Sequence, residues 1–351
     1  MGQRRWITRT AGLAVLAGVG VAIVPATGLA GTASVAVGHS TRNGDFDATA
    51  YQPSVITIHK GDSLKFEWNG FHTVSFPAKG QKVPGIVTRS STLAPPTNDP
   101  AGVPYWWGGT VPLLTFNSQA ARPTARKAVD GVHPVNSGFP NFGPRGAPPF
   151  TVTFPKVGTF RFGCAVHANM KGIVIVKPKS ARVPTAAAIA RRGKAELNVD
   201  LKAAKALKRK APKPDEVLVG AGTRDFEIYA MLGGTKTVAA GTTLTFRWAG
   251  REEAHTVTFG PKAFVDQVEQ TFNNAQGDLP GEGTFPSDPP TGAPVAITPT
   301  SHGNGFLNSG VLFDPGAGPG AHSFQVTFTT PGTYDFRCII HSNMRGRITV
   351  T

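Results

Sequence analysis

The sequence predicts an all-β protein made of two β-sandwiches in tandem, and three observations support this prediction. Segments starting at residues 61 and 150 recur, in the same order, at residues 241 and 324. Apolar and polar residues alternate inside these segments, which is the pattern of half-buried strands. The 42 glycines and 30 prolines divide the chain into short pieces, as is typical of turn-rich sandwiches.

Residues 1–33 are expected to be an export signal. A basic head containing Arg4 and Arg5 precedes an apolar run from Ala11 to Val24, and small residues follow. This order is typical of a secretory signal, and the run is shorter than the roughly 20 residues of a membrane-spanning helix. The paired arginines are also compatible with twin-arginine export. We therefore expect an extracytoplasmic protein, periplasmic, cell-wall or secreted, with an uncleaved anchor as the alternative.

The first sandwich is expected over residues 34–178. The segment "GDSLKFEWNGFHTVSF" and the later "FTVTFPKVGTFRFGCAVHANMKGIVIV" supply short strands with apolar residues at every second position. A long loop insertion over 77–149 separates them and contains the aromatic cluster "YWW" at 105–107. These aromatic residues are candidates either for docking a partner or for covering the sandwich or the neighbouring domain.

A basic helical linker is expected over residues 179–216. It is rich in Ala, Lys, Arg and Leu, and Leu197, Leu201 and Ala204 fall on one helical face. The segment could be a solvated spacer, or it could bind anions or a membrane surface. The second sandwich follows over 217–351, with "GTTLTFRWAGREEAHTVTF", an insertion over 260–320 and "FQVTFTTPGTYDFRCIIHSNMRGRITV".

The formal net charge of +15 could indicate an anionic partner. Much of the excess lies in the linker and at the N-terminus, while the flanking regions are more balanced. A dedicated nucleic-acid fold is therefore not implied. Membrane contact is expected only through an uncleaved signal or the basic linker.

Each of the two cysteines begins a Cys-x-x-His-x-x-Met motif, one in each copy. Such a loop can place three ligands around one ion, and a histidine that precedes Thr-Val in each copy can supply the fourth. The candidate ligands are His72, Cys164, His167 and Met170 in the first copy, and His255, Cys338, His341 and Met344 in the second.

The donor types indicate the metal. A thiolate, two imidazoles and a weak axial thioether suit a blue-copper electron-transfer site, whereas structural zinc prefers four firm nitrogen or sulfur ligands. Calcium and magnesium require oxygen ligands. A closed set of four ligands leaves no position for a substrate, so the sequence predicts two copper ions, electron transfer and no enzymatic activity. The electron donor and acceptor would be unidentified redox proteins.

The stretches "YQPSVITIHKGDSLKFEWNGFHTVSF" and "SGVLFDPGAGPGAHSFQVTFTTPGTYDFRCIIHSNMRGRITV" resemble the cupredoxins of the plastocyanin, pseudoazurin and amicyanin group. The resemblance covers the strands of both copies and implies Greek-key sandwiches, each with a type 1 copper held by the ligands above. Those relatives often have Asn after the first histidine and Pro before the second. This chain has Thr73 and Thr256 in place of the Asn, and Val166 and Ile340 in place of the Pro. The redox potentials of those relatives therefore do not carry over to it.

Other interpretations of the cysteines remain open at the level of sequence. A disulfide from Cys164 to Cys338 would suit an exported protein but would leave the matched histidines and methionines unexplained. Multicopper oxidases and nitrite reductases are also built from tandem cupredoxin domains. They place histidines beside the cysteine or in His-x-His pairs, and this sequence has neither.

Two further functions would use the same ligands. One is copper storage, scavenging or delivery outside the membrane, and the other is an interaction module in which copper staples the fold. His133 and His302, each upstream of an Asn-Ser-Gly, are candidates for a third copper between the domains, with a surface position as the alternative.

Overall fold

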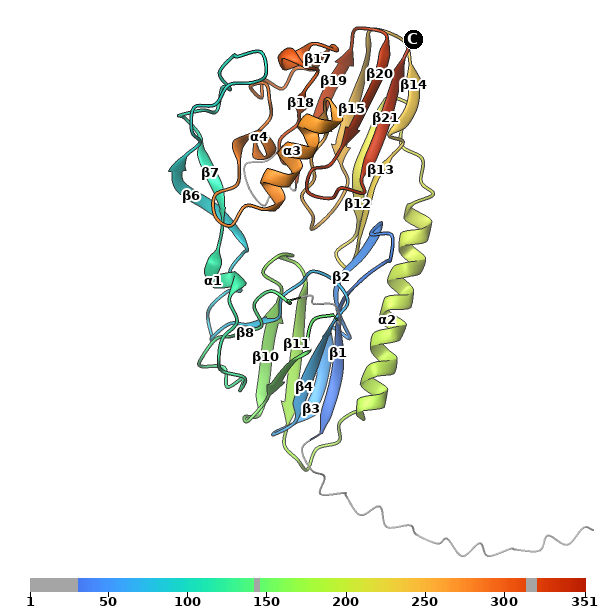
Figure 1. The fold of residues 1–351 in the computed structure, drawn as a ribbon. Helices are drawn as coiled ribbons and strands as arrows, with labels where there is room; N and C mark the ends of the chain where they lie inside the picture. Colours follow the sequence, from blue (N-terminus) through green and yellow to red (C-terminus); the bar gives the residue numbers. More distant parts are fainter. Residues whose placement is uncertain (1–30, 142–145, 314–320) are drawn as a thin grey trace, which may run out of the picture.

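The computed structural model describes residues 31–141, 146–313 and 321–351, and it confirms the all-β prediction (Figure 1). Most of the expected export signal lies outside the described residues. Its last two positions, Thr32 and Ala33, lie in the first strand, β1 (Thr32–Ser40). Among the described residues, no helix combines the length and apolar character needed to cross a membrane.

The first half of the chain folds into two facing layers of strands. Leu64 and Phe66, which alternate with polar residues in the sequence, are fully buried between the layers, as their spacing predicts. One layer contains β2 (Phe46–Gln52), β1, β4 (Ser63–Trp68) and β9 (Phe150–Thr153), and the other contains β3 (Val55–His59), β11 (Lys171–Lys177), β10 (Gly158–Gly163), β5 (Ser75–Phe76) and β8 (Val135–Asn136).

The second half repeats this arrangement. Leu244 and Phe246, at the positions equivalent to Leu64 and Phe66, are again fully buried. One layer contains β17 (Val295–Ile297), β19 (Ser323–Phe328), β15 (Thr242–Trp248), β12 (Glu216–Gly222) and β13 (Glu227–Leu232), and the other contains β14 (Thr235–Val238), β21 (Arg345–Val350), β20 (Gly332–Arg337), β16 (Thr258–Phe259) and β18 (Leu307–Asn308).

One sheet is continuous through both halves, a feature that the sequence analysis did not predict. Strand β13 of the second half pairs antiparallel with β2 of the first, with Glu227 opposite Asp47 and Ile228 opposite Phe46. The result is a sheet of nine strands, β17-β19-β15-β12-β13-β2-β1-β4-β9. The two sandwiches are therefore joined edge to edge by backbone hydrogen bonds as well as by the linker.

The expected linker contains a helix, α2 (Ala186–Leu207), which runs beside both halves (Figure 1). Thr185 caps its N-terminus by accepting a hydrogen bond from the Ala188 amide. Leu197 and Leu201 pack against Phe46 and Phe226 from the two halves, so the helix covers the junction of the shared sheet. The apolar face that the sequence predicts is thus buried on the protein.

The two insertions pack against each other. Tyr105 and Trp107 of the first insertion are buried in one cluster with Val268 and Phe272 of the second. These aromatic residues therefore cover neighbouring structure and do not form an exposed docking surface. The insertions contain β6 (Val87–Leu93), β7 (Pro112–Phe116), α1 (Ser118–Ala121), α3 (Lys262–Asn273), α4 (Gly281–Thr284) and η1 (Ser301–Gly303).

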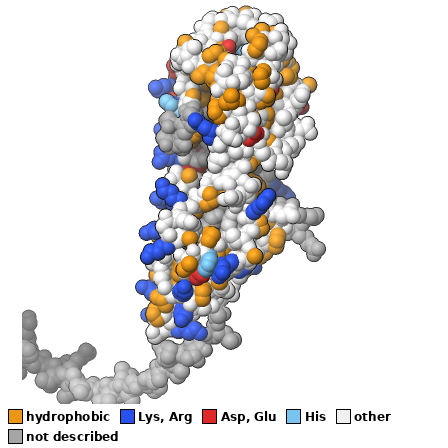
Figure 2. All heavy atoms as spheres, turned by 90° about the vertical axis from the view of Figure 1, so that its left-hand side faces the viewer, with side chains coloured by type: hydrophobic (Ala, Val, Ile, Leu, Met, Phe, Trp, Pro, Cys, Tyr) orange, Lys and Arg blue, Asp and Glu red, His pale blue; other side chains and the backbone are white. Residues whose placement is uncertain are grey.

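The surface carries the basic excess of the sequence. Figure 2 shows lysine and arginine side chains along one edge of the molecule, while apolar side chains are distributed over the face in view.

Candidate metal centres

The first cluster joins His72, Cys164 and His167, which are all buried. His72 lies just before β5, Cys164 follows β10, and His167 lies in the turn between β10 and β11. The two histidines face each other through Nδ1 at 2.9 Å, and Cys164 Sγ lies 3.8 Å from His167 Nδ1. Neighbouring strands of one sheet thus bring these three side chains together, although His72 and His167 are 95 residues apart in the sequence.

The second cluster repeats this geometry with His255, Cys338 and His341. The two histidine Nδ1 atoms are 3.1 Å apart, and Cys338 Sγ lies 3.9 Å from His341 Nδ1. In both clusters the Nδ1 edges of the imidazoles therefore point inward and the Nε2 edges point outward.

Each Cys-x-x-His-x-x-Met segment forms a tight loop closed by backbone hydrogen bonds. The Cys164 amide donates to the Met170 carbonyl at 3.0 Å, and the Met170 amide donates to the His167 carbonyl at 3.0 Å. The equivalent bonds of the second loop measure 3.0 and 2.9 Å. Met170 and Met344 are buried in the same apolar clusters as the cysteine of their own loop. The methionines therefore lie in the same core as the ligand clusters.

A threonine after the first histidine ties that residue to the cysteine loop. The Thr73 amide donates to Cys164 Sγ at 3.3 Å, and the Thr73 hydroxyl accepts a hydrogen bond from the Ala165 amide at 2.7 Å. Thr256 makes the same two contacts in the second copy, at 3.3 and 3.0 Å. These threonines stand where the cupredoxins named above often have Asn, and each fixes the cysteine loop through its hydroxyl group.

The surroundings of both cysteines favour the thiolate. Burial alone would raise the pKa of Cys164, but hydrogen bonds and positive charge from His167 and His72 lower this pKa well below its ordinary value. The pKa of Cys338 is lowered well below its ordinary value by its two histidines in the same way, against the opposing effect of burial. A thiolate is the form that binds a metal ion.

The donor set fits a transition-metal ion. Both cysteines are free, so the disulfide alternative does not hold. Nitrogen atoms 2.9 and 3.1 Å apart can both bond one ion at about 2.0 Å, and a sulfur at about 2.3 Å from the ion is compatible with separations of 3.8 and 3.9 Å. Two imidazoles with a thiolate match copper or zinc and not calcium or magnesium.

The outward edges of the first histidines differ between the two copies. His72 Nε2 lies 3.0 Å from Asp47 Oδ2, and both groups are buried. Burial opposes ionisation of Asp47, but the charge of His72 lowers the pKa of Asp47 below its ordinary value. His255 Nε2 is also buried. Neither buried Nε2 atom makes a well-aligned hydrogen bond among the described residues, but only His72 has a carboxylate within ion-pair distance of it.

The outward edges of the second histidines meet one carboxylate. Glu253 Oε1 contacts His167 Nε2, and Glu253 Oε2 lies 3.5 Å from His341 Nε2. Sequence reasoning missed Asp47 and Glu253. A usable signal exists for Glu253, because "WAGREEAH" in the second copy is three residues longer than "WNGFH" in the first.

The candidates for a third copper lie in other surroundings. His133 is exposed and its Nδ1 lies 2.9 Å from Asp130. His302 lies between Asp99, at 2.9 Å from Nδ1, and Asp288, at 3.3 Å from Nε2, and its ring is largely covered. Neither histidine belongs to a group of three potential ligands within metal-binding distance among the described residues. His302 instead links the first insertion to the second.

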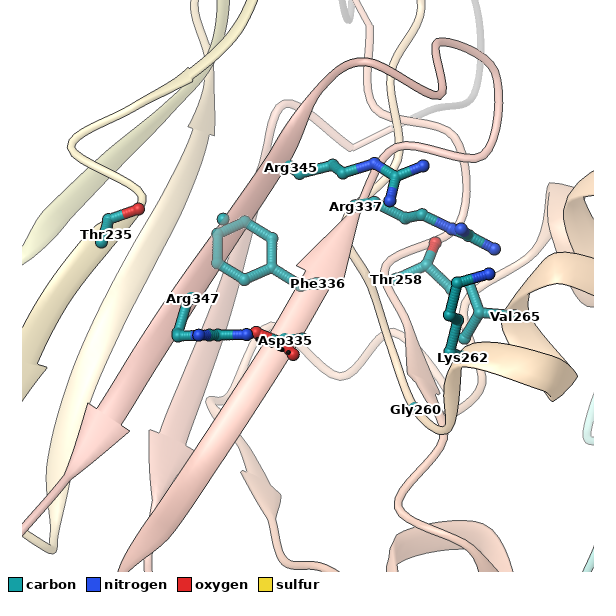
Figure 3. A pocket seen from close by; sticks show the side chains of 11 residues that line it. Thr235, Thr258, Gly260, Lys262, Val265, Asp335, Phe336, Arg337, Arg345 and Arg347 are labelled. Carbon is teal, nitrogen blue, oxygen red and sulfur yellow. Dashed lines mark hydrogen bonds and ion pairs between the residues drawn. The ribbon is translucent and has the colours of Figure 1, made fainter.

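A surface hollow of about 470 Å³ lies between β20, β21 and α3 (Figure 3). Its cationic side chains are largely neutralised, because Arg347 lies 2.6 Å from Asp335 and Arg337 lies 2.6 Å from Asp266. Figure 3 shows Arg345 and Arg337 projecting over the hollow from neighbouring strands. It contains none of the metal-ligand candidates.

The chain matches no profile of a known protein family. The search of curated proteins found no match to it either. Among solved structures, an amicyanin mutant in the Cu(I) form shares 13% identity over 42% of this chain and 82% of its own, with a TM-score of 0.21. A fern plastocyanin mutant shares 22% identity over 39% of this chain and 99% of its own, with a TM-score of 0.23. The oxidised plastocyanin of Dryopteris crassirhizoma shares 21% identity over the same fractions, with a TM-score of 0.22.

Proposed function

We propose that this chain is an exported copper protein that transfers electrons, with one type 1 copper in each of two cupredoxin domains. The observation that carries the proposal is the repeated, buried cluster of one unpaired cysteine and two histidines, His72, Cys164 and His167 in the first copy. The domains would span residues 34–178 and 217–351, with 1–33 directing export and 179–216 linking them. Copper, when bound, supplies a one-electron couple.

The described residues suit electron transfer because they hold the donors in place. Backbone hydrogen bonds from Cys164 to Met170 and from Met170 to His167 close the cysteine loop. The amide and hydroxyl of Thr73 fix the start of the loop. A site that is rigid before the ion binds changes little in geometry when the charge of the ion changes. Met170 in the first copy and Met344 in the second would complete the donor set, each with a weakly binding thioether.

Burial of the ligands supports an electron carrier over an enzyme and over a copper-delivery protein. Cys164 and His72 are almost completely covered, so a small substrate has no approach to the inward Nδ1 edge. A buried cage with preformed ligands also favours retention of the metal over its release. We therefore propose a carrier and not an enzyme, with redox proteins outside the cytoplasm as its electron donor and acceptor.

The test is to load the purified mature protein with Cu(II) and to measure metal content, visible spectrum and electron paramagnetic resonance. We expect two coppers per chain, an intense thiolate-to-copper band and narrow hyperfine splitting. Repeated reduction and reoxidation in the presence of a chelator should leave the copper content unchanged. Copper that passes to the chelator on reduction would favour storage or delivery, and a colourless protein would contradict the proposal.

Single-site variants provide the matched controls. Cys164→Ser and Cys338→Ser each remove the thiolate from one cluster and leave the other cluster intact. Each variant should retain one copper and about half of the band intensity, because each cluster has its own cysteine. Loss of both coppers in either variant would contradict two independent centres.

A further inference from the structure

The two metal centres approach each other through one side chain. Glu253 contacts His167 Nε2 with one carboxylate oxygen and lies 3.5 Å from His341 Nε2 with the other. Each of these histidines presents its Nδ1 atom to its own cluster. The connection between the clusters therefore consists of an imidazole ring, a carboxylate and a second imidazole ring.

Glu253 lies on a loop that is held in place from several directions. The indole of Trp248 donates to the Glu253 carbonyl at 2.7 Å. Glu227 accepts hydrogen bonds from the amides of Arg251 and Glu252. The three extra residues of the second copy therefore form a fixed projection and not a loose turn.

The projection reaches the ligand loop of the other copy, and that contact is reciprocated. The Asn169 amide of the first ligand loop donates to Glu252 at 3.0 Å. Asn343, at the equivalent position of the second ligand loop, donates to the Gly44 carbonyl of the first copy at 2.8 Å. Both ligand loops thus face the junction between the two halves.

The two histidines that contact Glu253 differ in how exposed their side chains are. The His167 side chain is 2% exposed and that of Glu253 is 14% exposed, whereas His341 is 17% exposed. His72 and His255 are fully buried. Among the four ligand histidines, His341 therefore offers the most accessible edge to an external redox partner. Tyr229 stacks on the His341 ring at 4.4 Å and narrows that access without closing it.

A carboxylate that is largely covered needs a partner, and Glu253 has a histidine on each side. An ion pair that only joins the two halves would need one partner. Here the carboxylate instead spans two residues that belong to two different clusters, through the ring atoms opposite the inward Nδ1 atoms. This arrangement distinguishes a bridge between centres from an ordinary contact between domains.

We infer that Glu253 is the bridge through which the first centre exchanges electrons with the second, and that external partners reach the first centre by way of the second. This inference rests on the proposed function. With copper bound, a one-electron donor such as a reduced redox protein would reduce the second centre, which would be reoxidised as it passes that electron to the first. The carboxylate would stay in contact with both histidines, and only the electron would move. Glu253 thus acts as a positioning and coupling residue.

The experiment follows the loss of the thiolate-to-copper band after rapid mixing of fully copper-loaded protein with a bulky anionic reductant. The wild type and Cys164→Ser, which has only the second centre, should bleach rapidly. Cys338→Ser, which has only the first centre, should bleach several times more slowly, because the histidines of that centre are the more deeply covered ones. Glu253→Gln should bleach in two phases of similar amplitude, one as fast as the wild type and one as slow as Cys338→Ser.

Glu252→Gln is the matched control, because it removes the same charge from the adjacent residue, whose carboxylate meets a backbone amide and not a histidine. It should bleach like the wild type. Copper content and the resonance spectrum of every variant show whether both centres are still formed. Single-phase, wild-type bleaching of Glu253→Gln with two coppers bound would overturn the bridge alone, as would fast bleaching of Cys338→Ser. A wild type without a copper band would instead overturn the proposed function, and the bridge with it.

Discussion

Asp47 and Glu227 lie directly opposite each other where β2 pairs with β13, at equivalent positions of the two copies. The two carboxyl groups nevertheless differ in charge. The charge of His72 lowers the pKa of Asp47 despite its burial, whereas burial raises the pKa of Glu227 to about 8. The shared sheet therefore places an ionised group opposite a neutral one at neutral pH, which avoids the repulsion of two facing like charges.

Asp47→Asn should weaken copper binding at the first centre only. The carboxylate orients the ring of His72 through a contact of 3.0 Å and raises the basicity of its inward nitrogen. Removing such a partner typically costs about 10–100-fold in metal affinity. Copper titration of Asp47→Asn in the Cys338→Ser background measures this effect. The redox potential of the first centre should also rise, because a less basic His72 stabilises Cu(II) less well and affects Cu(I) less.

The second centre supplies the control for this prediction. His72 forms an ion pair with Asp47, whereas His255 forms none with any carboxylate among the described residues, so no equivalent contact exists to remove. Asp47→Asn in the Cys164→Ser background should bind copper as tightly as Cys164→Ser alone. Equal losses of affinity at both centres would mean that the substitution disturbs the shared sheet and not the orientation of His72.

Glu227→Gln should change how stability depends on pH. The pKa of Glu227 is raised from 4.5 to about 8 in the folded protein, chiefly by burial, so the folded state holds a proton that the unfolded state releases. The wild type should therefore lose stability relative to Glu227→Gln as pH rises from about 5 to 8, by about 1.4 kcal/mol per pH unit at most. Urea unfolding of both proteins at pH 5, 6.5 and 8 measures the difference.

The comparison of the two proteins isolates this group. Glutamine keeps an oxygen that can accept from the amides of Arg251 and Glu252, but it cannot ionise. The free energies of unfolding of the two proteins should be similar at pH 5. A difference that stays constant from pH 5 to 8 would show that Glu227 is already ionised in the folded protein.

The sequence was sufficient to predict the strands and the tight Cys-x-x-His-x-x-Met loops, because both depend on local patterns. Alternation at Leu64 and Phe66 sets which face is buried, and the spacing within "CAVHANM" fits one tight loop. The shared sheet, by contrast, depends on the pairing of two edge strands, which leaves no periodic signal. Asp47 and Glu253 were missed because each contacts its histidine partner from a distant part of the chain.

Gly193→Ala should destabilise the protein, although alanine favours helices by about 1 kcal/mol over glycine. A side chain at this position of α2 would place its Cβ 2.5 Å from the Gln52 carbonyl oxygen, which is part of the backbone and cannot move aside easily. We expect a net loss of about 1–3 kcal/mol in the free energy of unfolding, measured with urea. Val199→Ala, at a helix position that is 67% exposed, is the control and should change stability by less than about 0.5 kcal/mol. A stabilised Gly193→Ala would mean that the helix does not dock this closely.

Trp107→Ala should loosen the contact between the insertions and disturb the second centre more than the first. The indole is 1% exposed, stacks on Tyr105 at 4.8 Å and packs in one cluster with Ile339, the residue after Cys338. Removing a buried Trp costs about 3–5 kcal/mol in the free energy of unfolding. The control is Val103→Ala in the same insertion, at a side chain that is 58% exposed. Urea unfolding should separate the two variants, and broadened copper resonance lines should be confined to Trp107→Ala in the Cys164→Ser background. Unchanged lines in that background, with the loss of stability observed, would show that the insertions stabilise the fold without shaping the second ligand loop.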